Sequence, residues 1–373
     1  MQNYEIIIKY TLYIINYFVP LLRRTDILPI IDTMKRLIGV LLATVLLVPI
    51  LRAENWMARL PDDALVAELS IPGAHDAATG SGWAGLNGAI GNLFAKTQDL
   101  ELPALWEAGV RAFDLRPAVY KRHMNLNHGM MPTRLHFEDV LQMMQTWLRD
   151  NPSEFIVIHL LHAGDGDKVE GQYEERITEL LHRPSWRESF ADFRPDLHVR
   201  DLRGKILILS RNAYSGTPVG GIFRNWTGSP DWRRQTQGRI VGARGTEAKA
   251  YMQDFSSTYA QGALDVKVAA LRRMLEFSTS HHATQPEEIV WVLNFCSAYS
   301  KVTKLFGHDI SRSNGYRDNA AHTHAAMLDY LHTHRGSTGI VLMDFAAVDR
   351  SHGYDIRGKE LVKEIIASNF INK

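Results

Sequence analysis

Two histidines stand out as the residues of this sequence best placed to do chemistry. His75 comes immediately before Asp76 in the segment IPGAHDAATG, residues 71–80, and His128 comes before a glycine in NLNHG, residues 125–129. Histidine exchanges protons near neutral pH, so two histidines can serve one reaction as its base and its acid. Other polar side chains follow apolar segments further along the chain, namely Asp114, Arg116, Arg211, Asp254, Asn294, Ser297 and Asp344.

These side chains suit phosphoryl transfer. One histidine would take a proton from an attacking hydroxyl and the other would give one to the leaving oxygen, while an arginine neutralises the phosphate charge. The single cysteine, Cys296, gives little support to thiolate chemistry, and the sequence has neither a Gly-x-Ser-x-Gly nor a His-Glu-x-x-His pattern. The HTH triplets at 322–324 and 332–334 could bind a metal, but a polar helix surface is the favoured interpretation.

The elements that must position these residues are strand-like and helix-like segments that alternate along the chain. Apolar runs predict strands at 68–71, 110–115, 155–161, 205–211, 288–295 and 339–345, and a further strand is expected to end at Asp254. Apolar residues at helical spacing predict helices at 137–150, 169–182, 263–278, 319–334 and 359–368. This alternation, without a Pro- or Gly-rich linker, predicts a single-domain α/β protein and favours a barrel over an open sheet. Because the parallel strands of a barrel end at one mouth, the polar residues that follow them should converge there.

The first 53 residues differ from the rest and predict a segment for export. A short basic start at 34–36 precedes a 14-residue apolar run, and Ala53 ends the segment. These features describe a cleavable signal peptide at 34–53, and the run is short for a membrane span. Residues 1–33 would then be a non-native upstream extension, with an N-terminal anchor as the alternative. The catalytic domain is expected at 54–373.

Charge and cysteine content narrow the classes of partner. Residues 1–53 hold six of the 42 basic and three of the 41 acidic side chains, so the remainder has a net charge of −2. A general electrostatic preference for nucleic acid is therefore not expected. Export of a chain whose single cysteine cannot form an intramolecular disulfide fits a periplasmic or bacterial secreted protein.

Six motifs, taken in order, resemble a known family. They are SIPGAHDAATG, GVRAFDLRP, LNHGM, NPSEFIVIHL, RGKILILSR and VLNFCS, and the resemblance runs from Leu69 to Asp344. Together they resemble the X-domain of bacterial phosphatidylinositol-specific phospholipase C. The resemblance implies a distorted TIM-type (β/α) barrel that cleaves the phosphodiester of a myo-inositol lipid. The inositol 2-hydroxyl would attack phosphorus and release diacylglycerol and a cyclic inositol phosphate.

The resemblance also implies a role for each matching residue. His75 resembles the general base, with Asp344 as its carboxylate partner, and His128 resembles the general acid, paired with Asp76. Arg116 matches the arginine that contacts the phosphate, and Asp114 would help to orient this group. Arg211 and Asp254 match positions that bind inositol hydroxyls. Since the calcium-dependent branch has an acidic ligand where Arg116 stands, the match implies catalysis without a metal or other cofactor.

Two departures concern recognition of the head group. Bacterial members tend to carry a lysine near the inositol where this chain has Leu161 or His162. The family also implies an aromatic residue shortly after Asp254 that stacks on the inositol ring; here Phe255 is adjacent to Asp254, but Ser256 stands two positions after it. The head group could therefore be a modified or glycosylated inositol, or the substrate could be another phosphodiester with vicinal hydroxyls.

The expected partner is a phosphatidylinositol-type lipid at a membrane surface, and the protein is expected to be a monomer. The stretches 80–94 and 220–232 carry Trp, Phe, Ile and Leu residues that could contact the membrane or pack onto the domain. Two alternatives remain open. One is a metal-dependent glycerophosphodiester phosphodiesterase, for which the predicted mouth offers little glutamate, and the other is an inert barrel that binds lipid head groups.

Overall fold

A computed structural model describes residues 55–212, 217–231, 238–305 and 307–370, and these residues form a closed barrel. The predicted signal peptide at 34–53, the upstream extension at 1–33 and Trp232 lie outside the described residues. Within the described residues no helix has both the length and the apolar character needed to cross a membrane.

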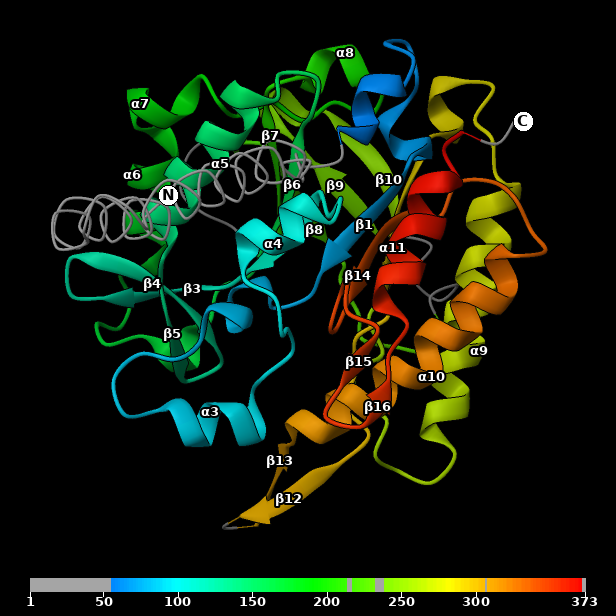
Figure 1. Cartoon of the computed structure of the whole chain (residues 1–373). Helices are drawn as coiled ribbons and strands as arrows, with labels where there is room; N and C mark the ends of the chain where they lie inside the picture. Colours follow the sequence, from blue (N-terminus) through cyan, green and yellow to red (C-terminus); the bar gives the residue numbers. More distant parts are fainter. Residues whose placement is uncertain (1–54, 213–216, 232–237, 306, 371–373) are drawn as a thin grey trace, which may run out of the picture. The chain divides into compact units, whose positions relative to one another are not determined.

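The barrel consists of mostly parallel strands interleaved with helices (Figure 1). In order around the barrel, the strands are β1 (Ser70–Ala74), β14 (Gly339–Met343), β11 (Val290–Phe295), β10 (Glu247–Gln253), β9 (Arg239–Val241), β8 (Gly221–Arg224), β7 (Ile206–Ser210), β6 (Ile156–Leu160) and β2 (Ala112–Leu115). The short strand β9 runs antiparallel to both neighbours, and the other described pairs are parallel. The predicted distorted TIM-type barrel is therefore confirmed, and β9 is a source of the distortion.

Helices cover the outside of the barrel. Amphipathic helices are expected there, because each buries an apolar stripe against the sheet. They include α5 (Phe137–Asp150), α6 (Tyr173–His182), α9 (Ala263–Ser280), α10 (Ser313–Leu331) and α11 (Gly358–Ala367), and shorter ones are α3 (Gly88–Phe94), α4 (Leu102–Glu107), α7 (Pro184–Arg187) and α8 (Val199–Leu202). The periodicity predicts α5 with its observed bounds. Helix α10 begins six residues before the predicted start at 319, because its first turn is polar and carries no apolar spacing.

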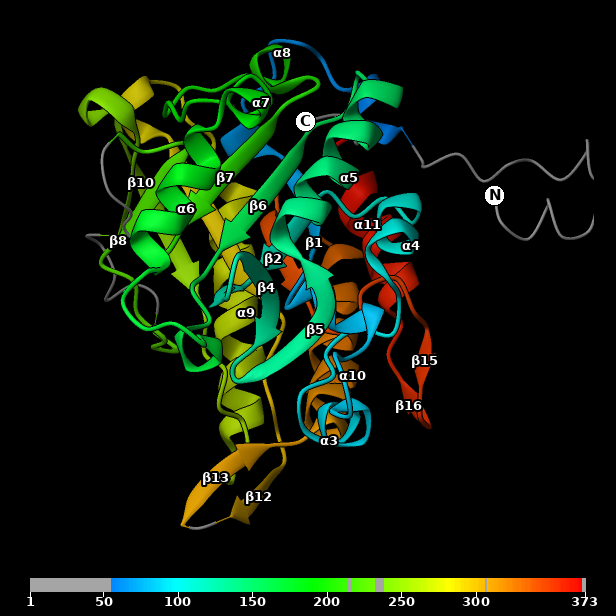
Figure 2. The ribbon, with the colours of Figure 1, turned by 90° about the vertical axis from the view of Figure 1, so that its left-hand side faces the viewer.

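Smaller sheets lie beside the mouth of the barrel. Strands β3 (Pro117–Tyr120), β4 (His123–His128) and β5 (Met131–His136) form one antiparallel sheet, and two hairpins pair β12 (Val302–Leu305) with β13 (His308–Ser311) and β15 (Arg350–Ser351) with β16 (Tyr354–Asp355). Figures 1 and 2 both place α3 and the β12–β13 hairpin at the same end of the barrel. A hydrogen bond joins the two, since the Ser311 hydroxyl donates to the Phe94 carbonyl, and just beyond them the Lys96 amide donates to the hydroxyl of Ser313 at the start of α10.

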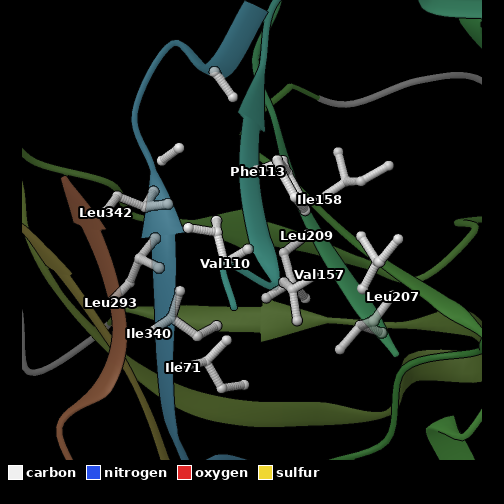
Figure 3. Packing of buried hydrophobic residues seen from close by; sticks show 14 of the residues in the cluster. Ile71, Val110, Phe113, Val157, Ile158, Leu207, Leu209, Leu293, Ile340 and Leu342 are labelled. Atoms are coloured by element: carbon white, nitrogen blue, oxygen red, sulfur yellow. The ribbon is translucent and has the colours of Figure 1, made fainter. Parts of the chain in front are cut away.

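The barrel interior is apolar at its base and polar at its mouth. Figure 3 shows buried apolar side chains of neighbouring strands packed together, among them Ile71, Leu293 and Ile340. Because alternate residues of a strand share a face, the position that follows Ile71 and Gly73 on the inner face of β1 is His75. Gly73 is needed below it, since a Cβ atom there would lie 2.6 Å from the Leu342 side chain. The same alternation carries the inner face of β14 from Leu342 to Asp344.

Candidate active site

His75 lies directly after β1 and contacts a carboxylate on one ring nitrogen and a guanidinium on the other. Its backbone N–H donates to the Met343 carbonyl, which extends the β1–β14 ladder by one residue and brings His75 beside Asp344. Nδ1 lies 2.7 Å from Asp344 Oδ1, and Nε2 lies 2.7 Å from Arg116 Nη2. Since a guanidinium can only donate, Nε2 is the acceptor and Nδ1 carries the proton that is donated to Asp344. This tautomer leaves the Nε2 lone pair facing the mouth.

The electrostatic surroundings keep His75 neutral. Burial, and then the positive charge of Arg116, hold the pKa of His75 well below the ordinary value of 6.5. Burial, and then the neighbouring charge of Asp76, raise the pKa of Asp344 well above its ordinary value. The lowered pKa of His75 and the raised pKa of Asp344 both favour one shared proton between the two side chains, in the hydrogen bond at Nδ1. The Nε2 atom of His75 therefore carries no proton and can accept one from a substrate.

Asp114 and Arg116 form the charged centre of the site. Arg116 donates from Nε and Nη2 to Asp114 Oδ2 at 3.1 and 2.7 Å. Although burial alone would raise the pKa of Asp114, Arg116 and His159 hold that pKa well below its usual range. Burial alone would lower the pKa of Arg116, but Asp114 and Asp76 raise it. The centre is therefore an ionised pair whose guanidinium also contacts His75 and Asp76.

Asp76 has a strained backbone that places it between the two histidines. Its φ of 43° is left-handed, a conformation that aspartate tolerates better than most residues. In this conformation its amide donates to Asp114 Oδ2 at 3.0 Å. Its own Oδ2 lies 3.0 Å from Arg116 Nη1, 3.4 Å from His75 Nε2 and 3.6 Å from His128 Nε2. The expected pairing of Asp76 with His128 is thus a looser contact than its pairing with Arg116.

His128, at the end of β4, is anchored by backbone from the loop after α3. Its Nδ1 donates to the Ala95 carbonyl at 2.6 Å, and its Nε2 faces the site, 3.3 Å from the hydroxyl of Tyr316. Tyr316 lies in the first turns of α10 and donates to Ser311. The acceptors Ala95, Asp76 and Tyr316 surround a ring that can carry a proton on each nitrogen.

Arg211 and Asp254 meet on the other side of the mouth, as the head-group prediction requires. Arg211 Nη1 donates to Asp254 Oδ2 at 3.1 Å, and the Trp226 indole N–H donates to the same oxygen at 3.1 Å. The Arg211 guanidinium also lies 4.1 Å above the Trp226 ring. Trp226 therefore supports the two head-group candidates, and Phe223 of the same stretch is buried. Of the two alternatives for the aromatics of 220–232, packing onto the domain applies to these two residues.

The two positions that depart from the family pattern supply no replacement for its lysine. Leu161 is apolar, and His162 is committed to a separate contact, with Nε2 2.8 Å from Asp167 Oδ2 and its ring stacked on Tyr173. Phe255, next to Asp254, is half-buried, and Ser256, two positions after Asp254, is exposed.

Sequence reasoning missed three residues of this site, His159, Tyr316 and Trp226. His159 lies in the apolar run of β6, where a lone histidine gives no signal, yet its Nδ1 lies 2.7 Å from Asp114 Oδ1. Tyr316 precedes the predicted start of its helix, and Trp226 resembles a surface aromatic. The register of β2 and β6, which pairs Asp114 with His159, is the information that the sequence alone did not provide.

The site also has three side chains that could approach one metal ion. Ligand atoms of His75, Asp76 and Asp114 lie within 4.8 Å of one another. The Arg116 guanidinium, however, contacts each of the three, so a cation bound by them would have to displace it. These residues fit a phosphate anion beside Arg116 better than a resident metal.

The chain thus forms a closed α/β barrel with two histidines, an arginine and several carboxylates at its mouth, an arrangement suited to acid–base chemistry on an anionic group. No protein-family model matches the chain. It is 26% identical over 323 residues to a 1-phosphatidylinositol phosphodiesterase of Staphylococcus aureus, and the match covers 85% of this chain and 94% of that protein. A Listeria monocytogenes protein of the same name is 32% identical over 165 residues, or 43% of this chain and 49% of the relative.

Solved structures show the same fold. A single-residue mutant of the Staphylococcus aureus phosphatidylinositol-specific phospholipase C matches with a TM-score of 0.67 at 22% identity, covering 86% of this chain and 98% of the other. The Listeria monocytogenes enzyme matches with a TM-score of 0.60 at 24% identity, covering 85% and 98%. The chain is thus a homologue of the bacterial phosphatidylinositol-specific phospholipases C.

Proposed function

We propose that the protein is a phospholipase C that cleaves phosphatidylinositol-type lipids to diacylglycerol and a cyclic inositol phosphate. The observation that carries this proposal is the chain of contacts Asp344–His75–Arg116, with His128 on the far side of Asp76. It provides a neutral base, a phosphate-binding cation and a second histidine within one mouth.

The proposed reaction begins when the lipid phosphate binds to the guanidinium of Arg116. Arg116 then donates to phosphate oxygens instead of to His75, which frees His75 Nε2 to accept the proton of the inositol 2-hydroxyl. The 2-oxygen bonds to phosphorus while the bond from phosphorus to the diacylglycerol oxygen breaks. His128 Nε2 gives its proton to that leaving oxygen, and Arg116 neutralises the charge that develops on the phosphate.

Head-group recognition is assigned to Arg211 and Asp254. The contact of Trp226 with both residues fixes a donor and an acceptor side by side, an arrangement that suits adjacent ring hydroxyls.

Export of the protein is a separate part of the proposal. The signal-like segment 34–53 supports secretion or a periplasmic location, where an inositol lipid would be met from outside the cell that makes the enzyme. A processed amino terminus after Ala53 in the purified native protein would support this, and an intact terminus upstream of Met34 would contradict it.

The proposed function is tested with two lipid substrates that differ at one oxygen. Phosphatidylinositol should release diacylglycerol, in the presence or absence of EDTA, whereas an analogue with a methylated 2-hydroxyl should bind and remain intact. Cleavage of the methylated analogue, or loss of activity in EDTA, would overturn the intramolecular, metal-free mechanism. Glycerophosphocholine serves as a phosphodiester without an inositol ring and should not react.

A further inference from the structure

His159 occupies an inner-face position of β6 in direct register with Asp114 of β2. It is 2% exposed, and its Nδ1 donates to Asp114 Oδ1 at 2.7 Å. The two strands are hydrogen-bonded neighbours, so this contact is set by the barrel itself. His159 therefore touches the charged centre of the site from below, away from any approaching lipid.

The two oxygens of Asp114 have different partners. Oδ2 accepts from Arg116 and from the Asp76 amide, and Oδ1 accepts from His159. A buried carboxylate whose Oδ1 lost its donor would be left with an unpaired oxygen and free to rotate about χ2. Because Arg116 is held through Nε and Nη2 on Oδ2, rotation of the carboxylate would re-aim the guanidinium.

Aromatic rings fix the orientation of His159. Its ring lies 5.5 Å from the ring of Phe295 and 5.5 Å from that of Trp226, with Phe223 at 6.2 Å. Its second nitrogen, Nε2, is buried and has no hydrogen-bond partner among the described residues. The ring is thus held by packing so that Nδ1, and only Nδ1, has a partner. Through Trp226 the same packing reaches Arg211 and Asp254.

We propose that His159 is a positioning residue that holds the Asp114 carboxylate so that Arg116 faces the lipid phosphate, and that it joins this centre to the head-group cluster through Trp226. The effect of His159 on catalysis rests on the proposed function. The hydrogen bond from His159 to Asp114 is a property of the folded chain, and its effect on Asp114 can be measured without substrate.

Two substitutions separate the hydrogen bond from the packing. His159→Phe keeps an aromatic ring against Trp226 and Phe295 but loses the donor. His159→Asn keeps an N–H near the position of Nδ1 but loses the ring. Ile158→Val, which trims a buried side chain on the outer face of the same strand, controls for general loosening of β6.

The first measurement is the titration of Asp114 by ¹³C NMR of aspartate-labelled protein, with Asp114→Asn to assign the signal. The groups facing Asp114 are Arg116, His159, His75, Asp76 and Arg211. All but His159 are unchanged in the variants. We expect Asp114 to protonate at higher pH in His159→Phe, and to titrate as in the wild type in His159→Asn and Ile158→Val.

The second measurement is kcat/KM on phosphatidylinositol vesicles as a function of pH. Loss of one charge-assisted hydrogen bond that aims Arg116 should lower kcat/KM by about 10- to 100-fold in His159→Phe and shift its acidic limb upward, with recovery in His159→Asn. An Asp114 titration in His159→Phe equal to that of the wild type, or equal losses in both variants, would overturn the inference. If the wild type cleaves no inositol lipid while the Asp114 titration still shifts, the proposed function fails and the positioning of Asp114 stands.

Discussion

His75 is prepared as a base by contacts on both of its ring nitrogens. Asp344 fixes the tautomer through Nδ1, and Arg116 occupies Nε2 until a phosphate takes its place. His128 has a different preparation, because its Nδ1 is used by a backbone carbonyl and its Nε2 faces acceptors. The two rings are therefore distinguishable in role although both contact Asp76.

Removal of either ring tests these roles. His75→Ala and His128→Ala should each lower kcat by about 10²- to 10⁴-fold, because general acid–base catalysis contributes that much in typical enzymes. Initial rates on phosphatidylinositol vesicles measure the effect, and His322→Ala, at an exposed histidine of α10, is the control. Activity near the wild-type level in either active-site variant, with an unchanged melting temperature, would refute the assignment.

The pKa of His75 should be visible in the pH dependence of the enzyme. A base works only when it is unprotonated, so the acidic limb of kcat/KM should lie below pH 6.5, the ordinary histidine value. Since Arg116 lowers the pKa of His75, the weakly active Arg116→Gln variant should show this limb at higher pH than the wild type. The pH dependence of kcat/KM, measured for both proteins, gives this shift. An acidic limb of Arg116→Gln at the same pH as the wild type, or at lower pH, would contradict the effect of Arg116 on the pKa of His75.

Helix α3 presents apolar side chains to solvent beside His128. Ile90 and Leu93 are 54% and 45% exposed, Leu86 just before the helix is fully exposed, and Met130 in the β4–β5 turn is 67% exposed. Trp83 of the same stretch is instead buried, and Gly91 packs against its ring.

We expect the exposed face of α3 to contact lipid. The double variant Ile90→Ser, Leu93→Ser should bind phosphatidylinositol vesicles at least about 10-fold more weakly, since each buried leucine or isoleucine side chain contributes about 1.5–3 kcal/mol. Vesicle sedimentation measures binding, and Val266→Ser on α9, at an apolar residue of similar exposure, is the control. Equal binding by both variants and the wild type would exclude this face.

The elements could be predicted where a single period dominates the sequence. The apolar runs of β6, β7, β11 and β14 and the apolar stripe of α5 are of this kind, and each was expected within a few residues. The antiparallel strand β9 has three residues and no periodic signal, and the β3–β5 sheet includes the half-exposed strand β5. These elements depend on pairing partners that no local pattern reveals.

The candidate site was predictable where its residues follow strands, and less so elsewhere. His75, Asp114 and Asp344 could be expected at the mouth because parallel strands end together. Which carboxylate meets which histidine depends on register and on the left-handed backbone of Asp76, so the looser contact of Asp76 with His128 could not be foreseen. His159 could not be singled out, because its significance lies only in its neighbour across the sheet.

The stability of the whole barrel should respond to a buried lysine. Lys267 of α9 is fully buried, and its ammonium donates to Gln253 Oε1 at 3.2 Å. Burial lowers the pKa of Lys267 from 10.5 to about 8. Below pH 8 the lysine is charged in both the folded and the unfolded chain, so the folded state bears the full cost. Between pH 8 and 10.5 the folded chain releases the proton first, and stability rises with pH.

Lys267→Met should therefore increase the free energy of unfolding near pH 7, by up to about 3 kcal/mol, and remove the rise at alkaline pH. Urea unfolding at pH 7 and pH 10 measures both effects, and Lys359→Met, at an exposed lysine, is the control. A variant that is less stable than the wild type at pH 7 would show that the Gln253 contact outweighs the burial of the charge.

The measurement that bears most directly on the proposed reaction is a ³¹P NMR time course with phosphatidylinositol vesicles. Because the site places a base for the 2-hydroxyl and an acid for the leaving oxygen around one phosphate, cyclic inositol phosphate should be the first phosphorus-containing product, with any acyclic phosphate appearing later. Formation of the acyclic phosphate from the first time point, with no cyclic species, would mean that water is the nucleophile and would contradict the mechanism built on His75, Arg116 and His128.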